Sequence, residues 1–189
     1  FVQNWPWAMG GANYPWWKYM KRPECRLHEM EDVAKRSSQA DAVAYYVAVM
    51  RAVKNGSLTY DNAAVVAISH DYNKVETVDI EAGRYFTDIE SQAGRPVALI
   101  GRDIAEYLLE NKDPLGKNIN IFGRKVEIIG ILKKEGNTTF GSSSDTWVMI
   151  PVNFGRNYVN LNSDNIEASI LVKGKKNVTN EALRDELTG

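Results

Sequence analysis

The stretch that decides the fold is Val97–Leu132, which reads VALIGRDIAEYLLENKDPLGKNINIFGRKVEIIGIL. The four apolar residues at its start favour a short buried strand that ends at Gly101. Apolar residues then recur at helical spacing over 102–110, and Asp113-Pro114 ends this helix because proline lacks the N–H group that a helix needs. Alternating apolar residues on both sides of Gly123 indicate a hairpin. The stretch therefore predicts one packed unit of strand, helix, tight corner and hairpin.

A second, longer hairpin is predicted before this unit. Residues 40–53 alternate between larger apolar side chains and alanines, which is typical of a strand in a packed sheet. Lys54-Asn55-Gly56-Ser57 follows, and Asn-Gly tolerates the positive φ angles of a tight turn. Residues 58–69 form the returning strand, with a polar interruption at Asp61-Asn62. A short helix is expected before the hairpin, over residues 24–38.

The segment Ala82-Gly-Arg-Tyr-Phe-Thr87 predicts a fixed corner. Gly83 supplies a backbone conformation that other residues avoid, and Phe86 anchors the corner in the core. Thr87 and Glu90 have the spacing of a capping box at the start of a helix. For Arg84 two roles are open: a hydrogen bond to loop carbonyls or to Glu90, or contact with an anionic ligand.

The remainder of the chain alternates strands and short helices. Residues 133–145 are rich in glycine and serine, which predicts an exposed, mobile loop. Phe140 in this loop either contacts a partner or is a hydrophobic plug, and the candidate contact residues are Asn137, Phe140 and Ser142. A strand is expected over 146–151, a short helix over 152–158, a strand over 166–172 and a helix over 179–187. The class is therefore α+β.

The first 22 residues hold four of the five tryptophans of the chain: Trp5, Trp7, Trp16 and Trp17. Prolines and glycines between them favour a loop, with at most a short strand at the start. Three interpretations stay open for these rings. They pack on their own domain, they form a surface close to a membrane or partner, or they form a platform for a ligand.

Composition argues against several classes of function. The 23 basic and 24 acidic residues nearly balance, so nothing in the charge predicts a nucleic-acid partner. No glycine-rich phosphate-binding motif occurs, and the two histidines and one cysteine lie far apart. His28, close to Glu29 and Glu31, lacks a second histidine at the i+4 spacing that metal ligands on a helix need. We expect no catalytic residue, no metal site and no cofactor in this part of the chain.

Together, the motifs Val97–Gly101, Asp113–Lys117, Ala82–Thr87 and Trp147–Pro151 resemble the MacB-type periplasmic core domain. This is the extracytoplasmic domain of ABC transporter permeases related to MacB, FtsX and LolC. The order and spacing of the motifs carry the resemblance over residues 65–170. The residues that we assign to these structural motifs are Gly83, Arg84, Phe86, Gly101, Asp113, Pro114, Gly116 and Pro151.

The resemblance implies a two-lobed periplasmic domain between the first and second transmembrane helices of an inner-membrane permease. Residues 1–64 and 152–189 would form a porter-like α/β lobe, and residues 65–151 an inserted sabre-like lobe of strands and helices. The resemblance implies that such a domain transmits ATP-driven motion and does not act as an enzyme. It also implies that ATP binds to a separate ATPase subunit or domain. The implied partners are that cytoplasmic ATPase, a second permease copy and, in subfamilies, a periplasmic adaptor, an outer-membrane duct, lipoprotein or a cell-wall hydrolase.

Two functions of other classes compete with this one. The aromatic N-terminal segment suggests a ligand-binding module. A carbohydrate-active enzyme is the third hypothesis, because the 24 acidic residues make some carboxylate pair in space inevitable.

Overall fold

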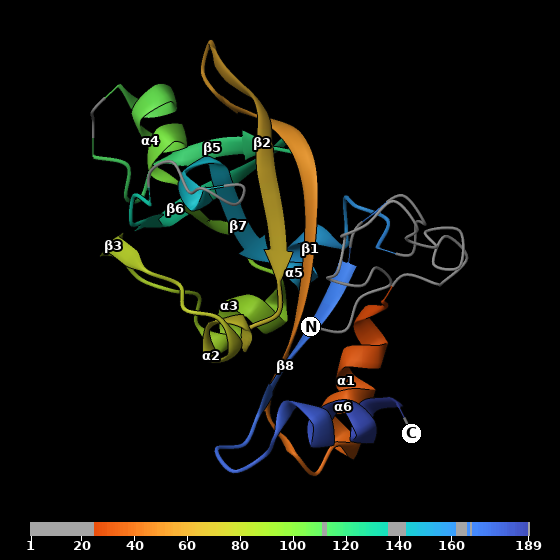
Figure 1. Cartoon of the computed structure of the whole chain (residues 1–189). Coiled ribbons are helices and arrows are strands. Elements are labelled where there is room, and N and C mark those ends of the chain that lie inside the picture. Colours follow the sequence, from red (N-terminus) through yellow and green to blue (C-terminus); the bar gives the residue numbers. More distant parts are fainter. Residues whose placement is uncertain (1–24, 111–112, 136–142, 162–165, 167, 189) are drawn as a thin grey trace, which may run out of the picture.

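A long antiparallel hairpin is the central element of the computed structural model, which describes residues 25–110, 113–135, 143–161, 166 and 168–188 (Figure 1). Strand β1 (Ala40–Asn55) pairs with β2 (Leu58–Ile68), from Tyr46 opposite Ile68 to Asn55 opposite Leu58. The turn therefore contains only Gly56 and Ser57, and Gly56 has φ +58°. This corrects the Asn-Gly turn expected from the sequence: Gly56 is the first central residue, and Asn55 belongs to the strand.

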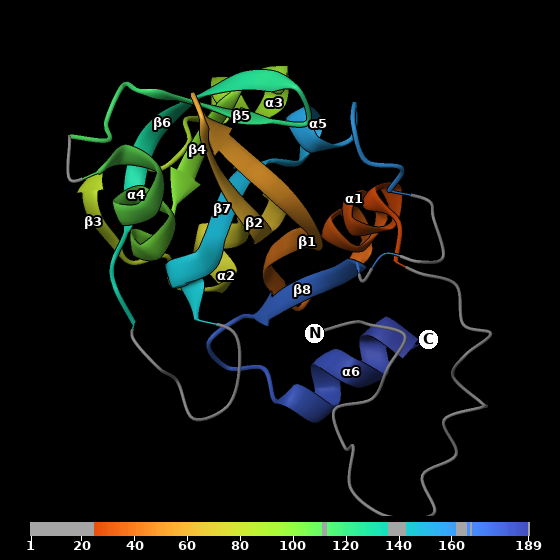
Figure 2. The ribbon, with the colours of Figure 1, turned by 90° about the horizontal axis from the view of Figure 1, so that it is seen from above.

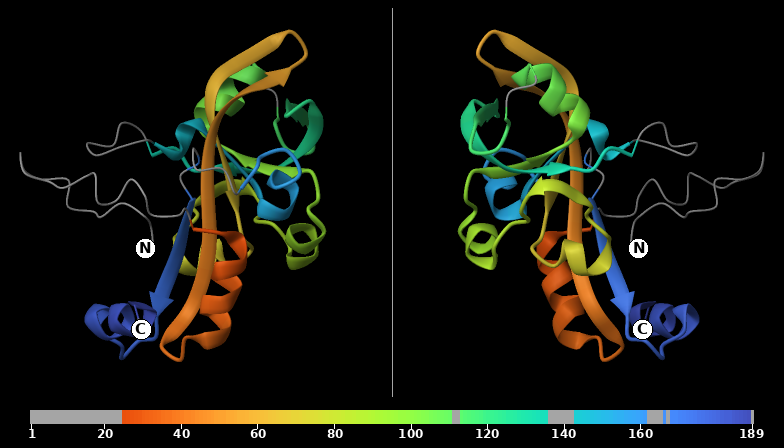
Figure 3. Two further views of the ribbon diagram at one scale, coloured as in Figure 1. Left: turned by 90° about the vertical axis from the view of Figure 1, so that its right-hand side faces the viewer. Right: turned by 90° about the vertical axis from the view of Figure 1, so that its left-hand side faces the viewer.

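A bulge bends the hairpin before its tip. The register shifts between Arg51 and Val53, and Asn62 on the opposite strand has φ +58°. Asparagine is one of the few residues that adopt this left-handed conformation at small cost. A bulge increases the local twist and bends the strand that carries it. Figure 3 shows the resulting curve, which carries the hairpin tip over α4 (Arg102–Leu109).

Strand pairing closes a ring of six strands. β2 pairs in parallel with β7 (Trp147–Pro151), which is antiparallel to β4 (Val97–Ile100). β4 is parallel to β6 (Arg124–Leu132), and β6 forms the predicted short hairpin with β5 (Asn118–Ile121). The ring closes where Lys54 of β1 pairs with Asn120 of β5. Closure leaves few exposed edges in this part of the molecule.

Two further strands extend the sheet outside the ring. β3 (Ile80–Gly83) pairs with β6, and β8 (Ala168–Gly174) pairs with the first part of β1. Helices α1 (Leu27–Arg36) and α6 (Asn180–Thr188) lie at the same end of the molecule as β8, and the hairpin tip lies at the other end (Figures 1 and 3). Figure 2 shows α6 beside β8.

Apolar residues form two clusters on the strands of this sheet. One cluster joins the strands to α4 and to α5 (Val152–Gly155), with Ile104, Leu108 and Phe154 buried in it. The other joins them to α2 (Tyr72–Val75) and to the corner before α3 (Asp88–Ala93), with Tyr72 and Phe86 buried. Burial of this apolar surface is the main stabilising term of such a fold.

The predicted α+β class is confirmed, and most predicted elements occur within a few residues of their expected bounds. The helix over 24–38 is shorter than expected, and α2 was not predicted. The division of the chain into lobes at residues 64/65 and 151/152 stays a prediction. The first of these boundaries falls inside β2, and the second between β7 and α5.

The glycine after β4 gives a direct test of this packing. A Cβ atom at Gly101 would lie 2.2 Å from the carbonyl oxygen of Asp145 and 2.4 Å from that of Ser144. We expect Gly101→Ala to lower the free energy of unfolding by about 3 kcal/mol or more, because backbone on both sides must move. A Cβ at Gly56 meets nothing within 4 Å. Gly56→Ala is therefore the control, with a cost of about 1 kcal/mol for its positive φ. Urea unfolding measures both, and equal costs would contradict the close approach.

Candidate functional site

The corner that precedes α3 is held by one carboxylate. Glu90 accepts two hydrogen bonds of 2.7 Å from the guanidinium of Arg84 and one of 2.8 Å from the backbone N–H of Thr87. The Thr87 hydroxyl accepts from the N–H of Glu90, so the predicted capping box forms. Of the two roles open for Arg84, the structure shows the local one. These bonds, first of all those from Arg84, lower the pKa of Glu90 to about 2.

The same corner is fixed to the sheet by its glycine. Gly83 has φ +86°, and a Cβ there would come within 2.3 Å of the carbonyl oxygen of Ile129 on β6. The next residue, Arg84, donates its backbone N–H to that carbonyl at 3.0 Å. Phe86 is buried in the adjacent core. The corner is therefore a rigid attachment of α3 to the sheet, and its charged groups are used within it.

The exposed loop predicted for residues 133–145 is confirmed at residues 133–135 and wrong at Asp145, while residues 136–142 lie outside the described residues. Asp145 is 3% exposed, and its carboxylate accepts the backbone N–H of Glu135 at 3.0 Å. The carboxylate of Glu135 in turn accepts the N–H of Ser144 at 3.1 Å. These two bonds join the chain on both sides of residues 136–142. No local sequence signal predicts this contact, because both partners lie in a polar stretch without periodicity.

The other motif residues form turns. The Asp113 carboxylate accepts the N–H of Leu115 at 3.1 Å, and Gly116, with φ +72°, donates its own N–H to Ile128 at 2.8 Å. Pro114 accepts the N–H of Lys117 at 3.2 Å. Pro151 is buried at the end of β7, opposite Ile68 of β2. The motifs thus lie at the ends of strands, where they fix the direction of the chain.

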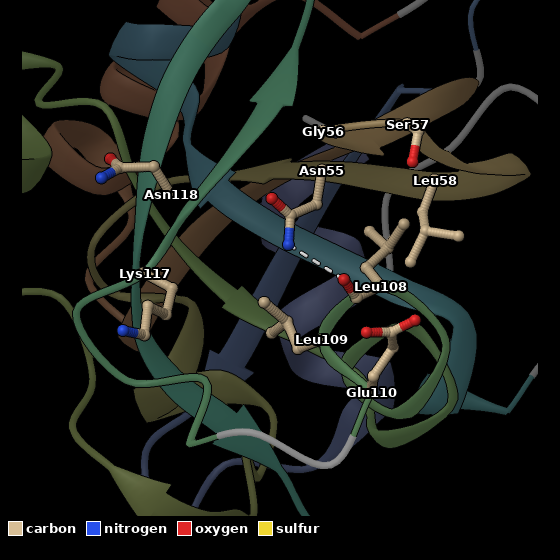
Figure 4. Close-up of a pocket in the computed structure, with 9 residues that line it drawn as sticks. All are labelled: Asn55, Gly56, Ser57, Leu58, Leu108, Leu109, Glu110, Lys117 and Asn118. Atoms are coloured by element: carbon tan, nitrogen blue, oxygen red, sulfur yellow. Dashed lines mark hydrogen bonds between the residues drawn. The ribbon is translucent and has the colours of Figure 1, made fainter.

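A pocket of about 510 Å³ lies under the hairpin tip (Figure 4). The side-chain amide of Asn55 donates to the carbonyl of Leu108 at 2.9 Å, and so binds the last turn of α4. Glu110 follows with φ +48°, a conformation that ends the helix. The residues that line the pocket are Asn55, Gly56, Ser57, Leu58, Leu108, Leu109, Glu110, Lys117 and Asn118.

The lining of this pocket comes from the hairpin tip, the end of α4 and the start of β5. Its lining contains no histidine or cysteine, and the charged groups of Glu110 and Lys117 come from opposite walls (Figure 4). The missed residue here is Asn55, which the sequence suggested as a turn residue. Its amide reaches Leu108 in the folded hairpin, a contact between groups 53 positions apart that no local pattern predicts.

Two groups of predicted contact residues lie outside the described residues. These are the loop residues Asn137, Phe140 and Ser142, and the tryptophans Trp5, Trp7, Trp16 and Trp17. Their roles stay predictions.

Neither a metal site nor a membrane span is found in the part of the chain that the structure describes. Within it, no group of three or more histidine, cysteine, aspartate or glutamate residues could hold a metal ion. No helix among the described ranges has the length and apolar character to cross a bilayer.

Comparison with known proteins identifies the family. The model of the MacB-like periplasmic core domain matches residues 2–189. The chain belongs to this family. The structure of the periplasmic region of MacB from Actinobacillus actinomycetemcomitans superposes on it with a TM-score of 0.74 and 18% identity, covering 89% of this chain and 73% of that one. The extracellular domain of YknZ, a transporter from Gram-positive bacteria, gives a TM-score of 0.66 and 22% identity over 84% of this chain and 76% of that one.

Sequence relatives of this MacB-like domain are named as ABC transporter permeases. An uncharacterized ABC transporter permease YknZ of Bacillus subtilis (strain 168) is 42% identical over 73 residues, 39% of this chain and 18% of the relative. A macrolide export ATP-binding/permease protein MacB of Neisseria meningitidis is 29% identical over 137 residues, 70% of this chain and 21% of the relative. The chain thus spans about a fifth of the length of these relatives. The expected resemblance is confirmed.

The hydrogen bonds to the Glu90 carboxylate predict that the free energy of unfolding depends on pH. A lowered pKa in the folded state means that ionised Glu90 stabilises the fold above its ordinary pKa of 4.5, and that this stabilisation is lost as the pH falls toward 2. Glu90→Gln should therefore cost about 1 kcal/mol at pH 7, a modest value because Arg84 is half-exposed, and nothing near pH 2. Urea unfolding at both pH values measures this, with the exposed Glu181→Gln as control. A cost that does not change with pH would contradict the assignment.

The contact under the hairpin tip predicts a second effect. Asn55→Asp keeps a residue of similar size but replaces the amide donor by a carboxylate that faces the carbonyl of Leu108. We expect a loss of about 1–2 kcal/mol in stability and faster amide exchange at the end of α4. Asn118→Asp, on the opposite wall of the pocket, is the matched control. If the amides at the end of α4 exchange at the same rate in both variants, the Asn55 contact does not hold the helix.

Proposed function

We propose that this domain transmits the ATP-driven motion of permease membrane helices to partners or substrate outside the cytoplasm, without catalysing a reaction. The observation that supports this most directly is the long strand β1. Its first residue, Ala40, pairs with Gly174 of β8 at one end of the molecule, and Lys54 pairs with Asn120 of β5 at the other. A strand of 16 residues is about 50 Å of extended chain at about 3.3 Å per residue.

The rest of the structure supports a stiff body around this strand. Closed strand pairing, two apolar clusters and fixed corners give the domain few places where it could bend. A domain that passes on displacement needs this property, because a soft domain would absorb the movement.

The names of the relatives support one of the partners that we propose, the ATPase. The MacB relatives carry ATP-binding and permease functions in one protein. ATP would accordingly act on a cytoplasmic ATPase, as a domain of the parent protein or as a separate subunit, and would need no site in this domain. The same proposal includes a second permease copy. It also includes a partner outside the membrane, which is an adaptor, a duct, a lipoprotein or a cell-wall hydrolase. Placement on the outer face of the cytoplasmic membrane is part of it as well.

Distance measurements on the full-length permease with its ATPase test the proposal. Ser57 at the hairpin tip and Lys176 beyond β8 are exposed, and each accepts a spin label after substitution by cysteine. Within one domain, the distance from position 57 to position 176 should be the same with and without ATP. Between two copies, the distance from position 57 to position 57 should change on ATP binding.

The control is a Walker-site variant of the ATPase, in which neither distance should respond. The buried Cys25 is replaced by alanine in all samples. A change in the intradomain distance, or a constant distance between copies with active ATPase, would contradict the proposed function.

A further inference from the structure

One carboxylate on the last helix receives a concentrated set of hydrogen bonds. Glu186 of α6 accepts from the hydroxyl of Ser37 at 2.5 Å, the hydroxyl of Ser38 at 2.7 Å and the backbone N–H of Ser38 at 2.9 Å. A fourth, longer bond of 3.3 Å comes from the N–H of Gln39. The donors all belong to the turn between α1 and β1, nearly 150 positions away in the chain. We call this set of contacts the clasp.

The turn has the form of an anion site, and Glu186 occupies it. Two successive backbone N–H groups and two hydroxyls point at the same carboxylate, an arrangement that favours negative charge. The Ser37 oxygen is itself held, because it accepts the N–H of Ala40, the first residue of β1, at 3.1 Å. The clasp therefore connects α6 directly to the start of the long strand.

Lys175, just after β8, adds contacts of the opposite polarity. Its ammonium donates to the carbonyl of Ser38 at 2.7 Å, and its backbone N–H donates to the carbonyl of Gln39 at 2.9 Å. The turn thus gives its donors to Glu186 and its acceptors to Lys175. The start of the segment that follows β8 and its end in α6 are thus bonded to the same turn, Lys175 to two of its residues and Glu186 to three.

Hydrophobic burial contributes little to the position of α6. No side chain described in this helix is buried, and its Leu183 side chain lies close to Gly174 of β8, where an added Cβ would be 3.3 Å from it. Helix α1 differs from α6 in this respect, because its partly buried Leu27, Met30 and Val33 pack against the core. In contrast to α4, whose apolar face is in the core, α6 is held mainly by the clasp.

We propose that Glu186 is the positioning residue that makes α6, the α1–β1 turn and β1 move as one unit. Displacement that reaches the domain at α6 then enters β1 and reaches the hairpin tip. Without the clasp, α6 is free to shift against the sheet, and the displacement is lost there. This inference rests on the proposed function, since it names the residue through which the transmission passes.

The test compares Glu186→Gln with Glu181→Gln in the full-length permease with its ATPase. Glutamine keeps the size of the side chain, but its NH₂ group faces donors of the turn and cannot accept from them. Glu181 lies exposed in the first turn of the same helix, so its variant controls for the loss of one charge. The first readout is amide exchange over residues 180–188, which should be about tenfold faster in Glu186→Gln only.

The second readout is the ATP-driven change in the distance between the two copies, measured at position 57. We expect it to fall to less than about half in Glu186→Gln, while the ATPase rate stays as in Glu181→Gln. The distribution of distances between labels at positions 57 and 182 of one domain should become broader in Glu186→Gln and stay narrow in the control. Ser37→Ala with Ser38→Ala removes the two hydroxyl donors from the other side and should give the same pattern.

The outcomes separate the two proposals. If wild type shows the change between copies and Glu186→Gln shows it to the same extent, the role of Glu186 is overturned and the proposed function stands. If wild type with active ATPase shows no change, the proposed function fails. In that case amide exchange still decides whether Glu186 holds α6. Equal exchange rates in Glu186→Gln and Glu181→Gln would show that the clasp does not hold this helix.

Discussion

The hydrogen-bonded register between β1 and β2 is the constraint on which the other parts of the structure depend. The two strands pair from Tyr46 opposite Ile68 to the hairpin tip, and every other strand of the ring attaches, directly or through a neighbour, to one of them. A slip of β2 by one residue would reverse its two faces. Val65 and Ala67, which are buried in one apolar cluster, would exchange places with Val66 and Ile68, which are buried in the other. The register is therefore fixed by burial as much as by the turn.

The bulge at Asn62 lets the two halves of this hairpin pack against different parts of the molecule. Before the bulge, β1 lies between β2 and β8, and after it the tip bends over α4 and meets β5. A straight hairpin of the same length would leave the side-chain amide of Asn55 far from the carbonyl of Leu108. A local irregularity of the backbone thus joins two regions that the strand order would otherwise leave apart.

The two ends of the molecule are stabilised by different forces. Around α4 and the ring, apolar side chains such as Ile104 and Leu108 are buried among the strands. At the other end, α1 packs its partly buried Leu27, Met30 and Val33 on the core. Helix α6 has no buried side chain among those described, and the hydrogen bonds of Glu186 and Lys175 hold this segment. Polar contacts of this kind are directional, so they define the position of a helix even where little apolar surface is available.

The sequence by itself determined the class of the fold, most of the elements within it and the family. Its periodic segments and turn residues are local signals, and the corner with Gly83 and the capping box of Thr87 and Glu90 depend on residues a few positions apart. The sequence could not show the closure of the ring, the burial of Asp145 or the clasp at Glu186. Each of these depends on groups that lie far apart in the chain and meet only when strands have paired. A carboxylate among many exposed ones is distinguished only by the donors that the tertiary structure brings to it.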